Sequence, residues 1–178
     1  QEFFDYYRAK MLNPDVLPNA AHKKLAELEK AGKLKAVITQ NIDSLHQKAG
    51  SKNVYELHGS VERNYCTKCG KMYDSDFILH SDGIPTCSCG GVIKPDVVLY
   101  DEALSDEVVS GAIAHISKAD LLIVAGTSLT VYPAAGLLGY FHGQYLALIN
   151  KDSTPIDNIA NFVSHDKVGE VLGSIEVR

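Results

Sequence analysis

Hydrophobic and polar positions recur along the chain at two different periods, and this predicts helices and short strands in alternation. Apolar residues at helical spacing predict a helix from Asn19, which can cap it, to Ala31, with Gly32 as the stop. A second predicted helix begins after Ser105, carries acidic residues in its first turn and keeps apolar residues on one face up to Ile116. Such a face must pack against another element.

Strand-like segments lie around these helices. They are residues 35–39, 54–57, 95–100, 121–125 and 145–149, with a further one near Phe162. The segment 121–125 is apolar throughout, which is typical of a central parallel strand covered on both faces. A short helix can run from Pro133 to about Phe141. The alternation predicts an α/β fold with a doubly wound parallel sheet, interrupted by an insertion at about residues 60–94.

Composition and charge narrow the function classes. The chain has 178 residues, 46% hydrophobic and 22% charged, as expected of a folded globular protein. Its 17 basic and 22 acidic residues give a net charge of -5, so we expect no direct nucleic-acid partner. The longest apolar run, residues 134–141, is far below the roughly 18 to 20 residues that cross a bilayer. We therefore expect no membrane span, no signal peptide and a cytoplasmic location.

All four cysteines of the chain lie in one short window. Cys66 and Cys69 form a C-x2-C pair, and Cys87 and Cys89 form a C-x-C pair, each followed by glycine. This spacing indicates two knuckles that aim four thiolates at one zinc ion. The alternative, two disulfides, needs an oxidising compartment and is usual in much smaller secreted scaffolds. Four thiolates leave no coordination position for water, so the predicted zinc is structural and the chemistry must lie elsewhere.

Polar residues follow several predicted strands, at the sheet edge where doubly wound folds bind ligands. The segment 39–46 after the first strand is rich in polar side chains, although a plain loop would have a similar composition. His58 follows the second strand, and an imidazole can act as a base near neutral pH. After the apolar strand, Gly126, Thr127 and Ser128 could meet a ribose or a phosphate. Each of these signals is weak when taken alone.

In this order the motifs resemble those of the sirtuins, the NAD-dependent protein-lysine deacylases. The resemblance spans residues 18–172, and its short C-x-C pair is more similar to bacterial members. It is carried by Thr-Gln-Asn-Ile-Asp at 39–43, Leu-His at 45–46, Glu-Leu-His-Gly at 56–59, the four cysteines, Gly-Thr-Ser-Leu at 126–129, Val131, Pro-Ala-Ala at 133–135 and Ile-Asn at 149–150.

The resemblance implies a Rossmann-like NAD-binding domain of residues 1–59 and 95–178, with a structural zinc module at 60–94. NAD and Zn²⁺ would be the cofactors, and acyl-lysine proteins or peptides the substrates, held between the two parts. His58 would be the general base. The implied cofactor contacts are Gln40 and Asn41 at the nicotinamide-side ribose, Ile42 and Asp43 at the carboxamide, Gly126, Thr127 and Ser128 along the phosphates, Asn150 at the adenosine ribose and Lys167 near the adenine. The implied peptide contacts are Val97, Val98, Leu99 and Val131.

Two departures from the family pattern stand out. Tyr100-Asp101-Glu102 replaces the usual Phe-Gly-Glu after the substrate-binding valines. The first strand, the Gly-Ala-Gly loop and the Asp-Phe-Arg segment of sirtuins have no counterpart before Gln1, so we expect the chain to start in a helical segment at residues 1–18, without the loop that binds the pyrophosphate.

The expected activity is NAD-dependent deacylation that releases nicotinamide and O-acyl-ADP-ribose, weak or absent in these residues alone. The alternatives are a catalytically inactive zinc-containing peptide-binding fragment and a mono-ADP-ribosyltransferase of the same fold.

Overall fold

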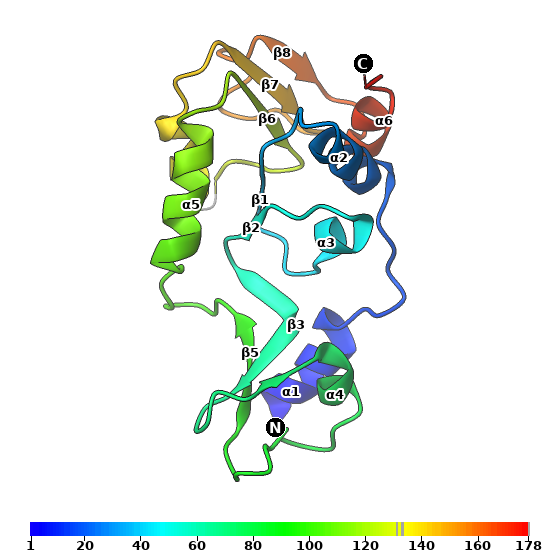
Figure 1. The fold of residues 1–178 in the computed structure, drawn as a ribbon, viewed down its shortest axis with the longest axis vertical. Coiled ribbons are helices and arrows are strands. Elements are labelled where there is room, and N and C mark those ends of the chain that lie inside the picture. Colours follow the sequence, from blue (N-terminus) through cyan, green and yellow to red (C-terminus); the bar gives the residue numbers. More distant parts are fainter. Residues whose placement is uncertain (131, 133, 178) are drawn as a thin grey trace. The chain divides into compact units, whose positions relative to one another are not determined.

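The computed structural model describes residues 1–130, 132 and 134–177, and they form two compact units. The first contains Gln1–Leu17, Asn41–Ser44 and His58–Leu104, and the second contains Pro18–Gln40, Leu45–Leu57 and Ser105–Arg178. Each unit has its own strands, paired within that unit (Figure 1). Each also has its own hydrophobic core. The division expected at residues 60 and 94 stays a prediction.

Two capped helices of the second unit confirm the prediction from periodicity. Helix α2 covers Ala20–Lys30, and Asn19 and His22 form a reciprocal capping box at its start. Helix α5 covers Asp106–Ile116, and the Ser105 hydroxyl accepts a hydrogen bond from the Val108 N–H group at 3.5 Å. The other helices of this unit are α3 (Leu45–Ala49), the 3-10 helix η2 (Ala134–Tyr140) and α6 (Val168–Gly173).

The strands of the second unit are all parallel to their neighbours. Strands β1 (Val37–Thr39) and β2 (Val54–Glu56) form one pair, and β6 (Leu121–Ala125), β7 (Tyr145–Ile149) and β8 (Phe162–Ser164) form a sheet in that order. Helices α2 and α6 lie side by side (Figure 1). Ala21, Ile149 and Leu172 make a buried cluster. This parallel architecture with covering helices confirms the predicted α/β class.

The central strand of the sheet is β7, so the prediction that residues 121–125 lie at the centre is wrong. Among the described residues, β6 pairs only with β7, and its Leu121 is 50% exposed. Leu148 on β7 is fully buried. Within this sheet of described residues, β7 pairs on both sides and β6 lies at an edge. The apolar side chains of β6 are therefore half-buried instead of fully covered.

The first unit holds an antiparallel sheet that the sequence did not predict. Its strands β3 (Gly59–Cys66), β4 (Met72–Tyr73) and β5 (Ile93–Val97) lie in the order β4-β3-β5. Its helices are α1 (Glu2–Tyr6), which continues as a π turn over Tyr7–Met11, and α4 (Ser75–Leu79). The buried core consists of Phe4, Tyr7, Leu12, Val61, Cys66, Ile78, Cys87, Ile93 and Val97.

The strand predicted at 95–100 is displaced toward the N-terminus. Strand β5 begins at Ile93 and ends at Val97, so Val98 and Leu99 lie beyond it. Beyond the strand, the Val98 N–H group bonds to the His58 carbonyl and the Leu99 N–H group bonds to the Glu102 carboxylate. Strand β5 also pairs antiparallel with β3, and it is not part of the parallel sheet.

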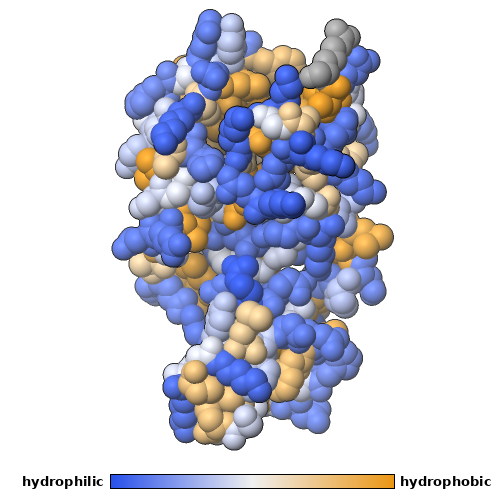
Figure 2. All heavy atoms as spheres, viewed as in Figure 1, coloured by the Kyte–Doolittle hydropathy of each residue, from blue (hydrophilic) through white to orange (hydrophobic). Residues whose placement is uncertain are grey.

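The surface is mixed in character. Hydrophilic side chains predominate on the face drawn in Figure 2, and hydrophobic residues lie there in small groups. None of the helices that the structure describes is long and apolar enough to span a membrane.

Candidate functional site

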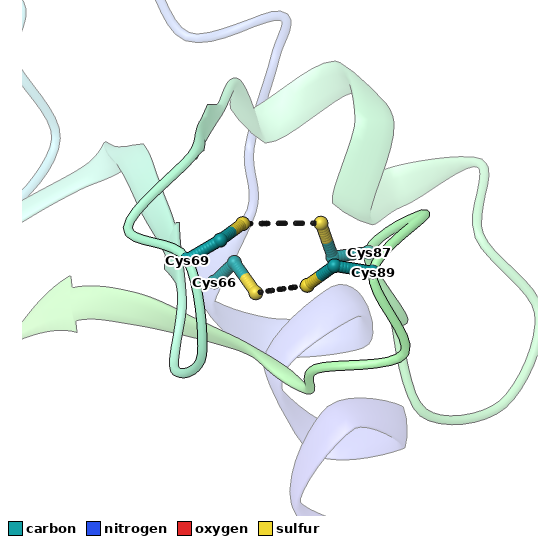
Figure 3. A group of neighbouring side chains, drawn as sticks. All are labelled: Cys66, Cys69, Cys87 and Cys89. Atoms are coloured by element: carbon teal, nitrogen blue, oxygen red, sulfur yellow. Dashed lines mark hydrogen bonds between the residues drawn. The ribbon is translucent and has the colours of Figure 1, made fainter.

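The four cysteine sulfurs come together as the spacing predicted (Figure 3). The Sγ atoms of Cys66 and Cys89 are 3.4 Å apart, those of Cys69 and Cys87 are 3.7 Å apart, and all four lie within 4.8 Å of one another. A tetrahedral zinc ion with bonds of about 2.3 Å separates its sulfurs by about 3.8 Å, which matches this spacing. A disulfide needs about 2.05 Å, so all four cysteines are free thiols. The residues therefore fit a structural zinc ion.

The thiol groups influence one another strongly. The backbone N–H of Cys89 and the hydroxyl of Tyr73 lower the pKa of Cys87 to about 5. The N–H of Gly91 lowers the pKa of Cys89, but the thiols of Cys66, Cys69 and Cys87 outweigh it and raise that pKa to about 12. Sulfurs this close share protons unless a cation lies among them, and Zn²⁺ is the cation that four thiolates favour.

Position 91 requires a glycine because the backbone there packs closely against the first cysteine knuckle. A Cβ atom at this position would lie 2.5 Å from the Cys66 Sγ and 3.0 Å from two side-chain atoms of Lys68. We therefore expect Gly91→Ala to displace the Cys66 sulfur and weaken zinc retention about tenfold, the usual cost of disturbing the groups around a metal ligand. Zinc per chain after dialysis against a chelator measures this effect.

The matched control is Gly139→Ala, because a Cβ at Gly139 has no atom within 4 Å among the described residues, apart from its chain neighbours and the backbone of its own helix. Equal zinc retention in both variants would mean that the knuckle tolerates the extra methyl group and that the packing argument is wrong.

His58 is half-buried in the turn that precedes β3. Gly59 has a φ of 74°, and a Cβ there would collide with the Asp96 carbonyl oxygen, so the turn requires glycine. The His58 carbonyl accepts a hydrogen bond of 3.0 Å from the Val98 N–H group. The predicted base and the predicted substrate segment are thus joined directly through the backbone.

The loop of Asn41, Ile42 and Asp43 is bonded to strand β3. The Ile42 carbonyl accepts from the Val61 N–H group at 2.9 Å, and the hydroxyls of Ser44 and Ser60 are 2.6 Å apart in a buried position. Strand β3 therefore anchors the loop next to the turn that carries His58. The first unit brings together residues 41–43, His58 and 97–99 of the predicted site.

The turn after the substrate segment contains the departure from the family pattern at residues 100–102. Asp101 has a φ of 68°, a conformation that favours glycine, at the position where the family usually has one. The Glu102 carboxylate accepts from the Leu99 N–H at 3.0 Å and pairs with Lys94 Nζ at 2.7 Å. Both contacts lower the pKa of Glu102, the Leu99 N–H group most. The aspartate therefore occupies the left-handed position itself, and the glutamate fixes the turn.

The second unit holds Gln40 and the remaining candidates. Gly126, with a φ of 62°, directly follows β6, and its N–H donates to the Ile149 carbonyl at 3.0 Å. This bond places Gly126, Thr127 and Ser128 beside Asn150, at the shared carboxyl edge of β6 and β7. Asn150 is buried, and its side-chain Nδ2 donates to the Asp152 carbonyl at 2.7 Å.

The remaining predicted residues are Lys167 and Val131. The Lys167 side chain is 81% exposed, and its Nζ lies 3.0 Å from the Glu170 carboxylate at the start of α6. Val131 lies outside the described residues, as does Pro133.

Two residues near the predicted sites gave no usable signal in the sequence. The Tyr73 hydroxyl donates to the Cys87 Sγ at 3.1 Å. The His165 Nδ1 donates to the Asn150 carbonyl at 2.8 Å, and its Nε2 lies 3.5 Å from the Asp157 carboxylate. The position of His165 after a strand resembles that of His58, but only the fold reveals its neighbour.

Comparisons with known proteins agree with this geometry. The Sir2 family model matches residues 1–133. The chain is 60% identical over 177 residues to an NAD-dependent protein deacetylase of Clostridium perfringens and 56% identical to one of Clostridium acetobutylicum, in each case covering 98% of this chain and 72% of the relative.

Solved structures give the same result. A Sir2 protein bound to acetylated peptide is 41% identical, with a TM-score of 0.88 over 96% of this chain and 75% of that one. A Sir2 homologue in complex with NAD is 38% identical, with a TM-score of 0.88 over 97% of this chain and 69% of that one. The resemblance that the motifs indicated is therefore confirmed, and the chain belongs to the Sir2 family, the sirtuins.

Proposed function

We propose that the protein is an NAD-dependent protein deacetylase, which removes acyl groups from lysine side chains and releases nicotinamide and O-acyl-ADP-ribose. The observation that carries the proposal is the grouping on β3: the His58 carbonyl bonds to Val98, and the 41–43 loop bonds to the same strand at Val61. A base, a polar loop and a substrate segment thus lie together at the start of β3. Its relatives in Clostridium carry the name of this activity.

NAD, when bound, supplies the ADP-ribose group that accepts the acyl group as nicotinamide leaves. The His58 imidazole would act as the general base toward the bound cofactor and accept a proton from a ribose hydroxyl. Ile42 and Asp43 hold the carboxamide, and Gln40 and Asn41 contact the adjoining ribose. The other cofactor contacts are Gly126, Thr127 and Ser128 at the phosphates, Asn150 at the adenosine ribose and Lys167 near the adenine.

The peptide binds along residues 97–99. The N–H groups of Val98 and Leu99 are already bonded to His58 and Glu102, so this segment offers a substrate carbonyl oxygens and apolar side chains more than amide donors. Recognition of the substrate main chain explains tolerance of many sequences. In this proposal Val131 contributes to the same subsite, and the enzyme acts on cytoplasmic proteins.

Zinc has no part in bond making here. Four thiolates, from Cys66, Cys69, Cys87 and Cys89, would saturate the ion, which then supplies a cross-link between the two knuckles. Strand β3 ends at Cys66 and begins at Gly59, so the cross-link supports the strand that carries the site.

The direct test is loss of the acetyl group from an acetyl-lysine peptide, followed by mass spectrometry with and without NAD. We expect deacetylation only when NAD is present, and inhibition by added nicotinamide. Binding of the peptide without any NAD-dependent change in its mass would favour the inactive binding module.

Asp43→Asn is expected to lower turnover about tenfold and to weaken inhibition by nicotinamide together with it. A carboxylate accepts hydrogen bonds from an amide N–H group more strongly than a neutral amide does. The half-buried Asp43 also lies 3.5 Å from the Asn41 side-chain amide, which an introduced asparagine would bind less well. Initial rates at several nicotinamide concentrations measure both effects.

Asp74→Asn is the matched control. Asp74 caps α4 through the Phe77 N–H group at 2.8 Å, and asparagine caps a helix equally well. Unchanged nicotinamide inhibition in Asp43→Asn would remove Asp43 from the carboxamide site.

A further inference from the structure

Tyr73 is held rigidly beside the cysteine cluster. It lies opposite Asn64 in the β3–β4 register, and the Asn64 side-chain amide donates to the Val61 carbonyl at 3.1 Å and to the Tyr73 carbonyl at 3.4 Å. Asn64 is fully buried. The backbone of the two-residue strand β4 is therefore held by its pairing with β3 and by the Asn64 side chain.

The Tyr73 ring is packed as firmly as its backbone. Its centroid lies 4.5 Å from that of Phe77 at a tilt of 43°, and Lys71 Nζ lies 5.1 Å from it. These contacts use the faces of the ring, and a phenylalanine would make them equally well. The hydroxyl has a separate partner, the Sγ of buried Cys87 at 3.1 Å.

We propose that Tyr73 is a positioning residue of the zinc centre, whose hydroxyl donates a hydrogen bond to the Cys87 thiolate and slows the release of the metal. A Zn²⁺ ion with four thiolates carries an excess of negative charge on its sulfurs. A hydrogen-bond donor draws part of this charge from one sulfur and fixes its direction. Cys66 receives a comparable bond from the Lys68 N–H group at 3.4 Å, but that donor belongs to the knuckle itself.

Release of zinc requires that a ligand sulfur move away from the ion. A hydrogen bond that fixes the direction of the sulfur opposes this movement. The Cys87 ligand is therefore held both by the short turn in which the Cys87 N–H bonds to the Gly91 carbonyl at 2.8 Å and by the side chain of Tyr73. Tyr73 lies on β4, outside the second knuckle, so its hydrogen bond to Cys87 also links β4 to that knuckle.

The test is the rate at which the full protein transfers zinc to a chromogenic chelator at fixed pH. Tyr73→Phe should transfer zinc about tenfold faster than the wild type, the usual scale for loss of a hydrogen bond to a metal ligand. Tyr65→Phe removes a hydroxyl from the neighbouring strand at a side chain that is 37% exposed, and it should leave the rate unchanged. Circular dichroism checks that both variants keep their fold.

A second readout separates the hydrogen bond from packing. In the cobalt-substituted protein, loss of the donor raises the energy of the sulfur electrons, so the sulfur-to-cobalt charge-transfer band of Tyr73→Phe should move to longer wavelength. Phe77→Leu disturbs the ring contact but keeps the Tyr73 hydroxyl, and its band should stay in place. Zinc transfer by Tyr73→Phe within twofold of the wild type, or the same band shift in Phe77→Leu, would overturn the proposal.

Discussion

In a chain extended to include the cofactor loop of the family, His58→Ala is expected to lower the turnover number for deacetylation by about 10² to 10⁴, the usual contribution of a positioned general base. The fold and most of the NAD affinity should survive. The structural reason is that His58 holds Val98 through its backbone carbonyl, which alanine retains, and its side chain is only half-buried. The loss should therefore appear in turnover.

Exchange of labelled nicotinamide distinguishes a base from a binding residue. In the proposed reaction nicotinamide would leave before the base is needed, so exchange should survive in His58→Ala better than net deacetylation does. His80→Ala is the matched control, since His80 is an exposed residue at the end of α4. Deacetylation by His58→Ala within threefold of the wild type would show that His58 is not the base.

Cys66→Ala is expected to remove zinc, loosen the first unit and abolish most activity indirectly. Cys66 combines two roles, because it is a zinc ligand by geometry and is also buried in the core of the first unit. Structural zinc contributes on the order of 10 kcal/mol to the folding of small zinc modules, more than the total stability of many domains. The disturbance reaches the site because β3 runs from Gly59 to Cys66.

Zinc content by elemental analysis and hydrogen exchange of β3 and β5 measure this prediction. Ser88→Ala is a control within the second knuckle, since its hydroxyl lies 3.9 Å from the Cys87 Sγ, too far for a strong hydrogen bond. Less than about half an equivalent of zinc in carefully prepared wild-type protein would contradict the structural role of zinc. So would a metal-free Cys66→Ala protein with full activity.

Features with local signals could be predicted from the sequence. The caps at Asn19 and Ser105 and the two cysteine knuckles depend on residues within a few positions of one another, and the structure has them where the sequence placed them. The parallel strand β7 was also predicted with its observed bounds, because it is a short apolar run between turns.

Features that depend on distant pairing were missed. Strand β3 contains Glu62 and Arg63, which break the apolar pattern, and Arg63 is balanced by Asp96 on β5 at 2.8 Å. Its register with β5 also shifts between Ser60 and Asn64. Neither the ion pair nor the register shift can be predicted from the spacing of residues along the chain. The same holds for the position of Tyr73 beside Cys87, which depends on the pairing of β3 with β4.

The most direct test of the proposed reaction follows the fate of the acetyl group. The protein is incubated with NAD and a peptide whose lysine carries an isotope-labelled acetyl group, and the products are identified by mass spectrometry. We expect equal amounts of nicotinamide, deacetylated peptide and ADP-ribose that bears the labelled acetyl group. Labelled free acetate as the primary product without consumption of NAD, or ADP-ribose attached to a peptide that keeps its acetyl group, would contradict it.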